Sequence, residues 1–581
     1  MTDQNKRLAT ILQDLGSMYR YLGGENLFKA IAYMKASQAI KSLPDDISLY
    51  LKEGTVKEIP GVGKSLEKDI REFYSTGSIS RFENLKKIVP HGLIELVDVR
   101  GFGPKSLKRL YEDLHVESKE DVVKALKDGR ITKLKGFGPR KVENMLRGLK
   151  LHKQLEERML LRDALEAGEK LLAPLKTLKE VKRAELAGSL RRRKETIGDL
   201  DILAAVKLKD RKKVVKVFTS PKLAQRVLAK GDTRVSILMQ ENGRQADLRM
   251  VDESEWGAAF QYFTGSKDHN IHLRRLARDK GYKISEYGIF TARNHKRLAG
   301  KTEEQLYKHL GMQYIPPEMR EDKGEIELAL KRAIPKLVEI KDIRGDLQMH
   351  SDWSDGLQTM EEIVDFVEKN FSYDYIAITD HTKSSRVARG MKDQEFLKQI
   401  EEVKVINQKQ GRDFLKAGAE VDILADGALD LSDEILSQLD WVVASIHSGF
   451  SRNNTDRLIK ACENSYVNCI GHPTGRLIGK REAYPVDIAA LIEAAVGTGT
   501  ALEINGQPER LDLKDEWANE AREAGVNLVI STDSHKYNDF YFMSLGVGVA
   551  RRAWCTADNI LNTKPWHDIV KLTSKGNLSV V

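Results

Sequence analysis

The sequence of 581 residues has few cysteines and no long apolar segment. Its three cysteines, Cys462, Cys469 and Cys555, are too few for a disulfide framework. No apolar run approaches the roughly 18–20 residues that cross a bilayer. The opening residues, MTDQNKRLAT, lack the apolar core of a signal peptide. These absences predict a soluble protein without a membrane partner, in a reducing compartment such as the cytoplasm.

Charge is unevenly distributed along the chain, which is long enough for about four domains. Its 95 basic and 86 acidic side chains give a net charge of +9. Residues 1–340 carry a net charge of +20, whereas residues 341–581 carry −11. The basic front indicates a polyanionic partner such as nucleic acid. The acidic back indicates carboxylates that either bind metals or serve solubility.

One glycine-rich phrase occurs three times in the first 150 residues, as IPGVGK at 59–64, VRGFGP at 99–104 and LKGFGP at 134–139. Each copy precedes a basic segment with helical periodicity. Amide groups in such a hairpin, next to a helix N-terminus, can bind phosphate. The repeat resembles three helix-hairpin-helix motifs, which contact the nucleic-acid backbone without reading sequence. A single copy could be an ordinary turn between helices. The glycines expected to contact DNA are Gly61, Gly63, Gly101, Gly103, Gly136 and Gly138.

The rest of the chain divides into two kinds of region. A charged segment over 151–172 predicts one long helix, followed by a mixed strand-and-helix region that ends near Pro316 and Pro317. Residues 320–337 are expected to form a charged amphipathic helix that acts as a linker. From Asp342 onward, short apolar runs alternate with helical stretches, which predicts βα units and a barrel-like parallel sheet.

Two aspartates in the sequence GDLDIL form the first candidate site. Asp199 and Asp201 alternate along a strand and therefore point the same way. Paired carboxylates need a neutralising cation, and their hard oxygens suit Mg²⁺ or Mn²⁺. Asp247, in a later strand, would complete a two-metal site that aligns a hydroxyl with a triphosphate. The same D-x-D spacing also occurs at solvated strand ends.

The segments GSLRRRKETIGDLDIL and YFTGSKDHNIHLRRLA resemble the family X DNA polymerases, the group containing DNA polymerase beta, over about residues 1–317. The resemblance implies helical fingers, a palm and a thumb, with Asp199, Asp201 and Asp247 holding two metal ions. It also implies a sugar pocket formed by Tyr262, Phe263 and Gly265, although the two aromatic residues could instead be a core pair. The implied nucleotide-binding residues are Gly188, Ser189, Arg192, Tyr262, Phe263, Gly265 and Asn270, with Arg274 near the template.

One position departs from the family pattern. Members with 5′-deoxyribose-phosphate lyase activity have a Schiff-base lysine in the helix after the first hairpin. Here the matching position is Asp69, and Lys68 stands one residue earlier. An offset of one residue turns a helical side chain by about 100°. We therefore expect Lys68 to point elsewhere and assign no lyase chemistry of that type.

Five of the six histidines after residue 342 lie at the ends of expected strands. In a βα barrel these ends converge on one face, where imidazoles and carboxylates together suit Zn²⁺, Mn²⁺ or Fe. Any one of these histidines could instead be a packed or surface residue. The candidate metal ligands are His350, Asp355, His381, Glu420, His447, His472, Asp533 and His535.

This half of the chain resembles the PHP (polymerase and histidinol phosphatase) superfamily. The resemblance implies up to three ions, Mn²⁺ or Zn²⁺, that activate water against phosphoesters. The order of the two halves resembles bacterial and archaeal family X polymerases, which implies Mn²⁺-dependent 3′→5′ exonuclease activity and 3′-end processing, with abasic-site cleavage left open. The usual H-x-H opening is Gln348-Met349-His350 here, so Gln348 would be a weaker ligand. Arg386 and Arg389 are candidates for holding the phosphate, or else belong to a solvated loop.

The sequence therefore predicts a multidomain DNA repair enzyme. It would fill short gaps in gapped or nicked duplex DNA with dNTPs, act as a monomer, and trim 3′ ends at the PHP site. Two alternatives stay open: a PHP nuclease with a DNA-holding front, and a small-molecule phosphatase with an unrelated binding front. The expected regions are an N-terminal helical helix-hairpin-helix domain (1–85), helical fingers with two further motifs (86–150), an α+β nucleotidyltransferase palm (151–260), a thumb (261–317), a linker (318–340) and a distorted TIM-like α/β PHP barrel (341–581).

Overall fold

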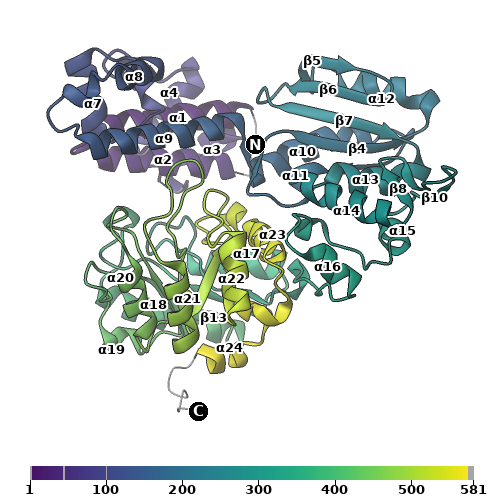
Figure 1. Ribbon diagram of the computed structural model, residues 1–581. Helices are drawn as coiled ribbons and strands as arrows, with labels where there is room; N and C mark the ends of the chain where they lie inside the picture. The colour runs from purple at the N-terminus through teal and green to yellow at the C-terminus, as the bar shows by residue number, and fades with distance from the viewer. Residues whose placement is uncertain (1–2, 44–45, 60, 98, 100, 574–581) are drawn as a thin grey trace.

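The computed structural model describes residues 3–43, 46–59, 61–97, 99 and 101–573. Within these ranges the chain forms a helical region, a sheet-containing region and a barrel-like region (Figure 1). The helical region and the sheet lie side by side above the barrel in Figure 1, and the barrel contacts both of them. Of the helices in the described ranges, none is both long enough and apolar enough to cross a membrane.

The N-terminal region is a bundle of helices around one apolar core. Leu8, Leu12 and Leu15 recur at helical spacing on α1 and are fully buried, so α1 provides the surface against which α2, α5, α6 and α7 pack. Each predicted hairpin leads directly into a helix, namely α4, α7 or α9; Pro60 and Arg100 of the first two motifs lie outside the described residues. The helices are α1 Asp3–Leu22, α2 Asn26–Ser42, α3 Ile47–Glu53, α4 Lys64–Thr76, α5 Ser80–Lys86, α6 His91–Ile94, α7 Pro104–Leu114, α8 Lys119–Lys127 and α9 Pro139–Glu157.

The expectation of a single helix over 151–172 is wrong. Helix α9 ends at Glu157, and a new helix, α10, spans Leu161–Lys176. Between them the short strand β1, Met159–Leu160, pairs with β3, Thr196–Ile197. Met159 is buried, so the strand pairing anchors the chain to the sheet-containing region at this point. The charged helical pattern continues on both sides of the break and conceals it.

The middle region contains a five-stranded sheet in the order β2-β4-β7-β6-β5. Strands β4 and β7 are parallel, whereas the other neighbours are antiparallel. Residues 202–206 of the central strand β4 are all buried, as expected for a strand covered on both faces. The further elements are β2 Val181–Leu186, α11 Gly188–Arg191, β4 Leu200–Val206, α12 Arg211–Phe218, β5 Ala224–Lys230, β6 Arg234–Met239 and β7 Gln245–Val251.

The next region packs around its own small core. Met319, Ile326, Ala329 and Leu337 pack into this core. The expected linker helix over 320–337 is absent, because α16, Glu325–Leu330, is the only helix in that range. Arg320 and Glu325 are fully buried, where Arg320 pairs with Glu303 and Glu325 pairs with His269. The charged pattern therefore includes a buried ion pair of Arg320 with Glu303 and a buried hydrogen bond between Glu325 and His269, which a solvated helix would not have. The other elements are α13 Trp256–Thr264, α14 Lys267–Asp279, β8 Tyr282–Ser285, β9 Gly288–Thr291, β10 Arg297–Ala299 and α15 Glu303–His309.

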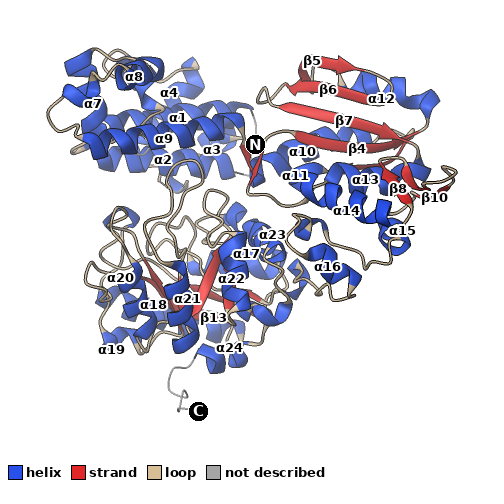
Figure 2. Cartoon of the chain, in the orientation of Figure 1, coloured by secondary structure: helices blue, strands red, loops and turns tan. Residues whose placement is uncertain are grey.

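The C-terminal region contains a seven-stranded parallel sheet in chain order, from β11 to β17, with helices around it (Figure 2). A bridge between Met349 and Ser534, and a hydrogen bond of 3.0 Å from Asp533 N to the Gln348 carbonyl, bring its two edges together. The sheet is thus a nearly closed barrel, which confirms the expected architecture. Its elements are β11 Gly345–Asp346, α17 Met360–Asn370, β12 Tyr375–Ile378, α18 Asp393–Gln410, β13 Leu415–Asp422, α19 Asp433–Leu436, β14 Trp441–Ser445, α20 Thr455–Glu463, β15 Cys469–Ile470, α21 Ile488–Thr498, β16 Ala501–Asn505, α22 Asp515–Glu523, β17 Leu528–Ser531, α23 Met543–Arg552 and α24 Trp566–Thr573.

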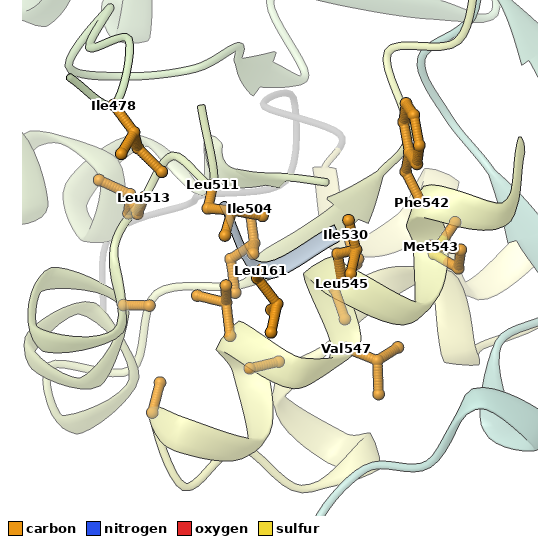
Figure 3. Close-up of a cluster of buried hydrophobic side chains, with 14 of the residues drawn as sticks. Leu161, Ile478, Ile504, Leu511, Leu513, Ile530, Phe542, Met543, Leu545 and Val547 are labelled. Carbon is orange, nitrogen blue, oxygen red and sulfur yellow. The ribbon is translucent and has the colours of Figure 1, made fainter. Parts of the chain in front are cut away.

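One apolar cluster joins the sheet-containing region to the barrel. Leu161 of α10 is fully buried among barrel side chains that include Ile504, Leu511 and Leu545 (Figure 3). An ion pair of 2.8 Å between Arg476 and Glu195 lies at the same boundary. Because burial of apolar side chains is the main stabilising contribution to folding, this shared cluster fixes the barrel against the sheet-containing region.

Candidate active sites

Three aspartates meet at one end of the central strands of the five-stranded sheet. Asp201 on β4 stands opposite Asp247 on β7 in the parallel register, and Asp199 precedes β4. Ligand oxygens of all three lie within 4.8 Å of one another. Burial, together with Asp199 and Asp247, raises the pKa of Asp201 to about 7. A divalent cation would relieve this repulsion, so the donor set fits Mg²⁺ or Mn²⁺.

Gly188 lies directly against these aspartates. Its φ is +61°, and a Cβ at this position would lie 2.2 Å from Asp201 Oδ2, so only glycine fits. Ser189 and Arg192 follow it around the turn of α11. A cavity of about 390 Å³ opens here, and it brings together all the nucleotide-binding residues expected from the sequence. Its lining is Gly188, Ser189, Arg192, Asp199, Asp201, Tyr262, Phe263, Thr264, Gly265, Lys267, Asn270 and Arg274.

The aromatic pair Tyr262 and Phe263 is only partly buried and lines this cavity, which disfavours the alternative of a plain core pair. Their rings pack edge to face with centroids 5.2 Å apart. Asn270 is held in place because its Nδ2 donates to the Tyr262 carbonyl at 2.8 Å, and its Oδ1 accepts from Gln261 at 2.8 Å. The wall of the cavity is thus preorganised by side chains of α13 and α14.

Arg192 is fixed by one contact with the cavity wall, at Thr264, and one contact outside the cavity, at Glu321. Its Nε donates to Glu321 Oε1 at 3.0 Å, and its Nη1 donates to the Thr264 carbonyl. Burial opposes ionisation of Glu321, but Arg192 and Arg552 hold the pKa of that carboxyl below its ordinary value. The sequence did not mark Glu321, because it lies within the segment that was expected to be a linker helix.

The barrel gathers the histidine-containing ligand set at the carboxyl ends of its strands, as expected. Glu420 lies at the centre: its Oε1 is 2.8 Å from His472 Nε2 and 3.4 Å from His447 Nε2, and its Oε2 is 3.1 Å from His381 Nδ1. Three overlapping groups of ligand atoms, each within 4.8 Å, are His350, Asp355, His381 and His535; His381, Glu420 and His447; and His350, Glu420 and Asp533.

Several polar atoms of this site are buried but have no hydrogen-bond partner among the described residues. Such atoms are available to bind metal ions. They are His350 Nδ1, His381 Nδ1, His472 Nδ1 and Glu420 Oε2. Buried polar atoms normally have a partner. Atoms of His381 and Glu420 face each other at 3.1 Å without forming a hydrogen bond, as two ligands of one ion do. The set of imidazole and carboxylate donors therefore fits divalent transition metals.

The pKa values of the histidines in the barrel site depend on burial and on nearby carboxylates. Burial alone would lower the pKa of His447, but Glu420 and Asp422 raise it to about 10. Asp355 and Asp533 likewise oppose burial and raise the pKa of His535 to about 10. Burial lowers the pKa of His381 to about 4. A cation would displace protons from His447 and His535, since metal binding requires neutral imidazole.

Gln348 lies at the position where the resemblance to the PHP superfamily led us to expect histidine. Its side chain is buried, and both Oε1 and Nε2 lack hydrogen-bond partners within the described ranges. Its Oε1 lies 3.5 Å from the position that a Cβ on Gly471 would occupy, so it lies beside the residue before His472. An unpartnered amide oxygen at this place is available as a hard ligand.

The arginines around the barrel site differ in the hydrogen bonds that they already make. Arg389 Nη2 donates to the Asp352 and Ser354 carbonyls, which ties it to the loop before Asp355. Arg386 lines the cavity of about 410 Å³ above the ligands. Arg510 also lines that cavity; its Nε lies 3.6 Å from Asp533 Oδ2, and its buried Nη1 has no hydrogen-bond partner in the described part of the chain.

Arg510 and Asp422 also belong to this site, although the sequence patterns did not indicate them. Arg510 is preceded by no motif that would have marked it. Asp422 lies 2.6 Å from His447 Nδ1 and thereby orients that ring. The spacing Glu420-x-Asp422 on β13 places both carboxylates on one face, and this alternation could have indicated Asp422.

The hairpins of the N-terminal region leave their second glycines exposed. At Gly63, Gly103 and Gly138, an added Cβ would have no described atom within 4 Å, and these glycines stand immediately before α4, α7 and α9. The first glycines have φ values of +84°, +93° and +86° at Gly61, Gly101 and Gly136, which suit glycine. This arrangement fits the backbone contact expected of the motif.

The position of the family's Schiff-base lysine is a buried acid here. Asp69 accepts a hydrogen bond from Tyr33 and pairs with Arg81 at 3.2 Å. Lys68 is exposed on the neighbouring face of α4. The expectation that Lys68 points away from this position is therefore confirmed.

The two sites define the class of the protein: a nucleotidyltransferase-like palm joined to a metal-binding phosphoesterase barrel. Family comparisons support this division. Residues 259–321 match the DNA polymerase beta thumb, residues 3–79 match a helix-hairpin-helix domain, and residues 93–151 match a SAM-like helix-hairpin-helix tandem.

Similar proteins extend the match to nearly the full chain. The DNA polymerase/3′-5′ exonuclease PolX of Bacillus subtilis (strain 168) is 37% identical over 559 residues, covering 95% of this chain and 96% of that protein. DNA polymerase lambda of Rattus norvegicus is 26% identical over 55% of this chain and 57% of its own length. A "Probable phosphatase" of Thermoanaerobacter sp. (strain X514) is 34% identical over 28% of this chain and 69% of its own length. The chain belongs to the PolX family of family X DNA polymerases with a 3′-5′ exonuclease region.

Proposed function

We propose that this protein fills short gaps in DNA at the palm and trims 3′ ends at the barrel. The observation that carries the proposal is the presence of two separate metal-ligand clusters in one chain of this family. One activity forms a phosphodiester bond and the other breaks one, and both depend on divalent metal ions.

At the palm, the 3′ hydroxyl of a primer attacks the α-phosphate of a dNTP; the new P–O bond forms as the bond to pyrophosphate breaks. Two cations held by Asp199, Asp201 and Asp247, as Mg²⁺ or Mn²⁺, would align the reacting oxygens and neutralise charge. Gly188, Ser189 and Arg192 bind the triphosphate. Tyr262, Phe263 and Gly265 form the sugar pocket, while Asn270 and Arg274 contact the nascent pair and the template.

At the barrel, the oxygen of water forms a bond to the terminal phosphorus as the bond from that phosphorus to the 3′ oxygen of the preceding nucleotide breaks. The last nucleotide leaves as a 5′-monophosphate, and the shortened strand keeps a 3′ hydroxyl. Up to three ions, Mn²⁺ or Zn²⁺, would activate the water and neutralise the phosphate there. Arg510, whose buried Nη1 has no partner among the described residues, donates to a phosphate oxygen. The proposed ligands are His350, Asp355, His381, Glu420, His447, His472, Asp533 and His535, with Gln348 as a weaker ligand.

The DNA partner we propose is a gapped or nicked duplex in the cytoplasm, bound by one copy of the chain. Gly61, Gly63, Gly101, Gly103, Gly136 and Gly138 place amide groups against its backbone. The proposed regions keep the boundaries expected from the sequence, and Met319, Ile326, Ala329 and Leu337 of the expected linker support extending the thumb into that segment.

The test is a duplex with a one-nucleotide gap and a 5′-labelled primer, with and without dNTPs, in each metal. Asp201→Ala should abolish extension and keep 3′ shortening, whereas His381→Ala should do the reverse. Absence of incorporation by wild type with either Mg²⁺ or Mn²⁺ would favour a nuclease with a DNA-holding front. Faster turnover of a small phosphomonoester than of an oligonucleotide would favour the small-molecule phosphatase.

A further inference from the structure

A cleft of about 930 Å³ lies where the helical region, α10 and the barrel meet, outside both active sites. One wall comes from α1, α2 and α9, which lie above the barrel in Figure 1. The opposite wall comes from barrel loops at residues 449–451, 477–481, 509 and 536. We call it the interdomain cleft.

The interdomain cleft and the cavity of the histidine site share three loops of the barrel. In each of these three loops, a residue that lines the histidine site is next in sequence to a residue that lines the cleft. These neighbours are Ser448 and Gly449, Arg510 and Glu509, and His535 and Lys536, the first of each pair lining the site. The cleft is therefore the neighbouring cavity along these loops.

Positive charge dominates the lining, although the barrel region is acidic as a whole. Of the described residues that line the cleft, five are cations and one, Glu509, is a carboxylate, which lies 2.9 Å from Lys480 Nζ. The guanidinium of Arg481 lies 3.8 Å from the centre of the Phe450 ring, so a planar stack forms part of the wall. Cationic grooves with aromatic or guanidinium stacks are typical of single-stranded nucleic-acid binding. The cations are Arg20, Arg162, Lys480, Arg481 and Lys536.

Polar contacts hold the two walls together on either side. Lys35 Nζ donates to the carbonyl of Gly356 at 3.1 Å. Gly356 directly follows Asp355, a candidate metal ligand, in the sequence. Arg147 pairs with Glu482 at 3.4 Å. Leu357 also packs into the apolar core of the helical region. The helical region and the barrel are thus joined by polar and apolar contacts.

We propose that the interdomain cleft binds the single-stranded DNA segment that precedes the 3′ end while the terminal phosphodiester lies in the histidine site. The proposal rests on the exonuclease function proposed above. The cleft volume of about 930 Å³ lies near the upper end of the ~300–1,000 Å³ range that is typical of binding sites for drug-sized ligands. It therefore accommodates a few unpaired nucleotides but not a double helix.

The test uses full-length protein with single-stranded oligonucleotides of increasing length. The variants are Arg20→Glu, on the helical wall, and Arg481→Gln, on the barrel wall, with Lys404→Glu on α18 as the matched control outside the cleft. Binding is measured by fluorescence anisotropy without added metal, and hydrolysis is measured with the oligonucleotides and with bis(p-nitrophenyl) phosphate. Thermal unfolding checks that each variant is folded.

Each cleft variant should raise KM for a 20-nucleotide strand about tenfold and weaken anisotropy binding, while hydrolysis of the small diester keeps the wild-type kcat. The slope of log K against log salt should fall by about 0.7 for each phosphate that the variant no longer neutralises. Wild-type KM, affinity and salt slope in both variants would overturn the proposal. If wild type binds strands through the cleft cations but does not shorten them, the exonuclease function fails while the binding site stands.

Discussion

Arg552, at the end of α23 in the barrel, donates a hydrogen bond of 2.9 Å to the backbone carbonyl of Arg192 in the palm. The same guanidinium donates to Glu321 Oε1 at 2.9 Å, which also accepts from Arg192. Its other end pairs with Asp515 at 2.6 Å. A residue of the exonuclease region thus holds the arginine that is proposed to bind the dNTP triphosphate.

Arg552→Gln should raise KM for the dNTP more than it lowers kcat, because Arg192 loses its support without losing its own side chain. Loss of charge-assisted hydrogen bonds of about 1.5–3 kcal/mol predicts roughly a tenfold effect or more on KM. The measurement is single-nucleotide gap filling over a range of dNTP concentrations. Arg551→Gln is the matched control, since Arg551 contacts Glu318 and the Val338 carbonyl instead. Equal effects of the two substitutions would contradict this role for Arg552.

Arg510→Gln should lower kcat/KM for 3′ shortening by about 10²-fold, because the phosphate loses a preorganised guanidinium donor. Arg510→Lys should restore part of this activity, since it keeps the charge but not the planar fork. Metal content measured by mass spectrometry should stay at the wild-type level in both variants. Loss of metal from Arg510→Gln would show that Arg510 supports Asp533 and does not act on the phosphate.

Gln348→His should bind Mn²⁺ or Zn²⁺ more tightly, because imidazole is a better transition-metal ligand than an amide oxygen. We expect the weakest-binding ion to gain about 10-fold in affinity, measured by metal titration with a chelator. Gln348→Ala should weaken the binding of the same ion. Identical titrations for all three proteins would show that residue 348 is not a ligand.

Glu303→Gln should destabilise the thumb, because Arg191 and Arg320 would lose their shared carboxylate. Burial opposes its ionisation, yet Arg320 and Arg191 lower the pKa of Glu303 to about 2, from an ordinary value near 4.5. The shift corresponds to about 3 kcal/mol. Since the folded pKa is depressed, this stabilisation is present above about pH 4.5 and is lost as the pH falls toward 2.

Urea unfolding of wild type and Glu303→Gln as a function of pH measures this difference. The gap in free energy of unfolding should be largest near neutral pH and shrink below about pH 4.5. Glu304→Gln, an exposed neighbour on the same helix, should change stability little at any pH. A gap that stays constant with pH would mean that the two arginines do not depend on the charge of Glu303.

Motifs with a fixed local geometry could be predicted from the sequence. Asp199 and Asp201 lie together because strand alternation is local, and His447 and His472 converge because parallel strands end on one face. The break between α9 and α10 could not be predicted, because strand pairing of Met159 with Ile197 overrides a helical pattern. The absence of a helix over most of residues 318–340 could not be predicted either, because ion pairs such as Arg320 with Glu303 bury charges that normally indicate solvent.

The residue types of both sites, and the βα order that brings the histidines together, could be predicted from the sequence. Packing of the folded chain decided which arginine of the barrel site is available to a phosphate, since Arg389 is tied to loop carbonyls while Arg510 keeps an Nη1 without a partner among the described residues. It also decided that Arg552 supports Arg192 and that basic residues of three regions line one cleft. These contacts join residues hundreds of positions apart, and no local periodicity records the packing of one domain against another.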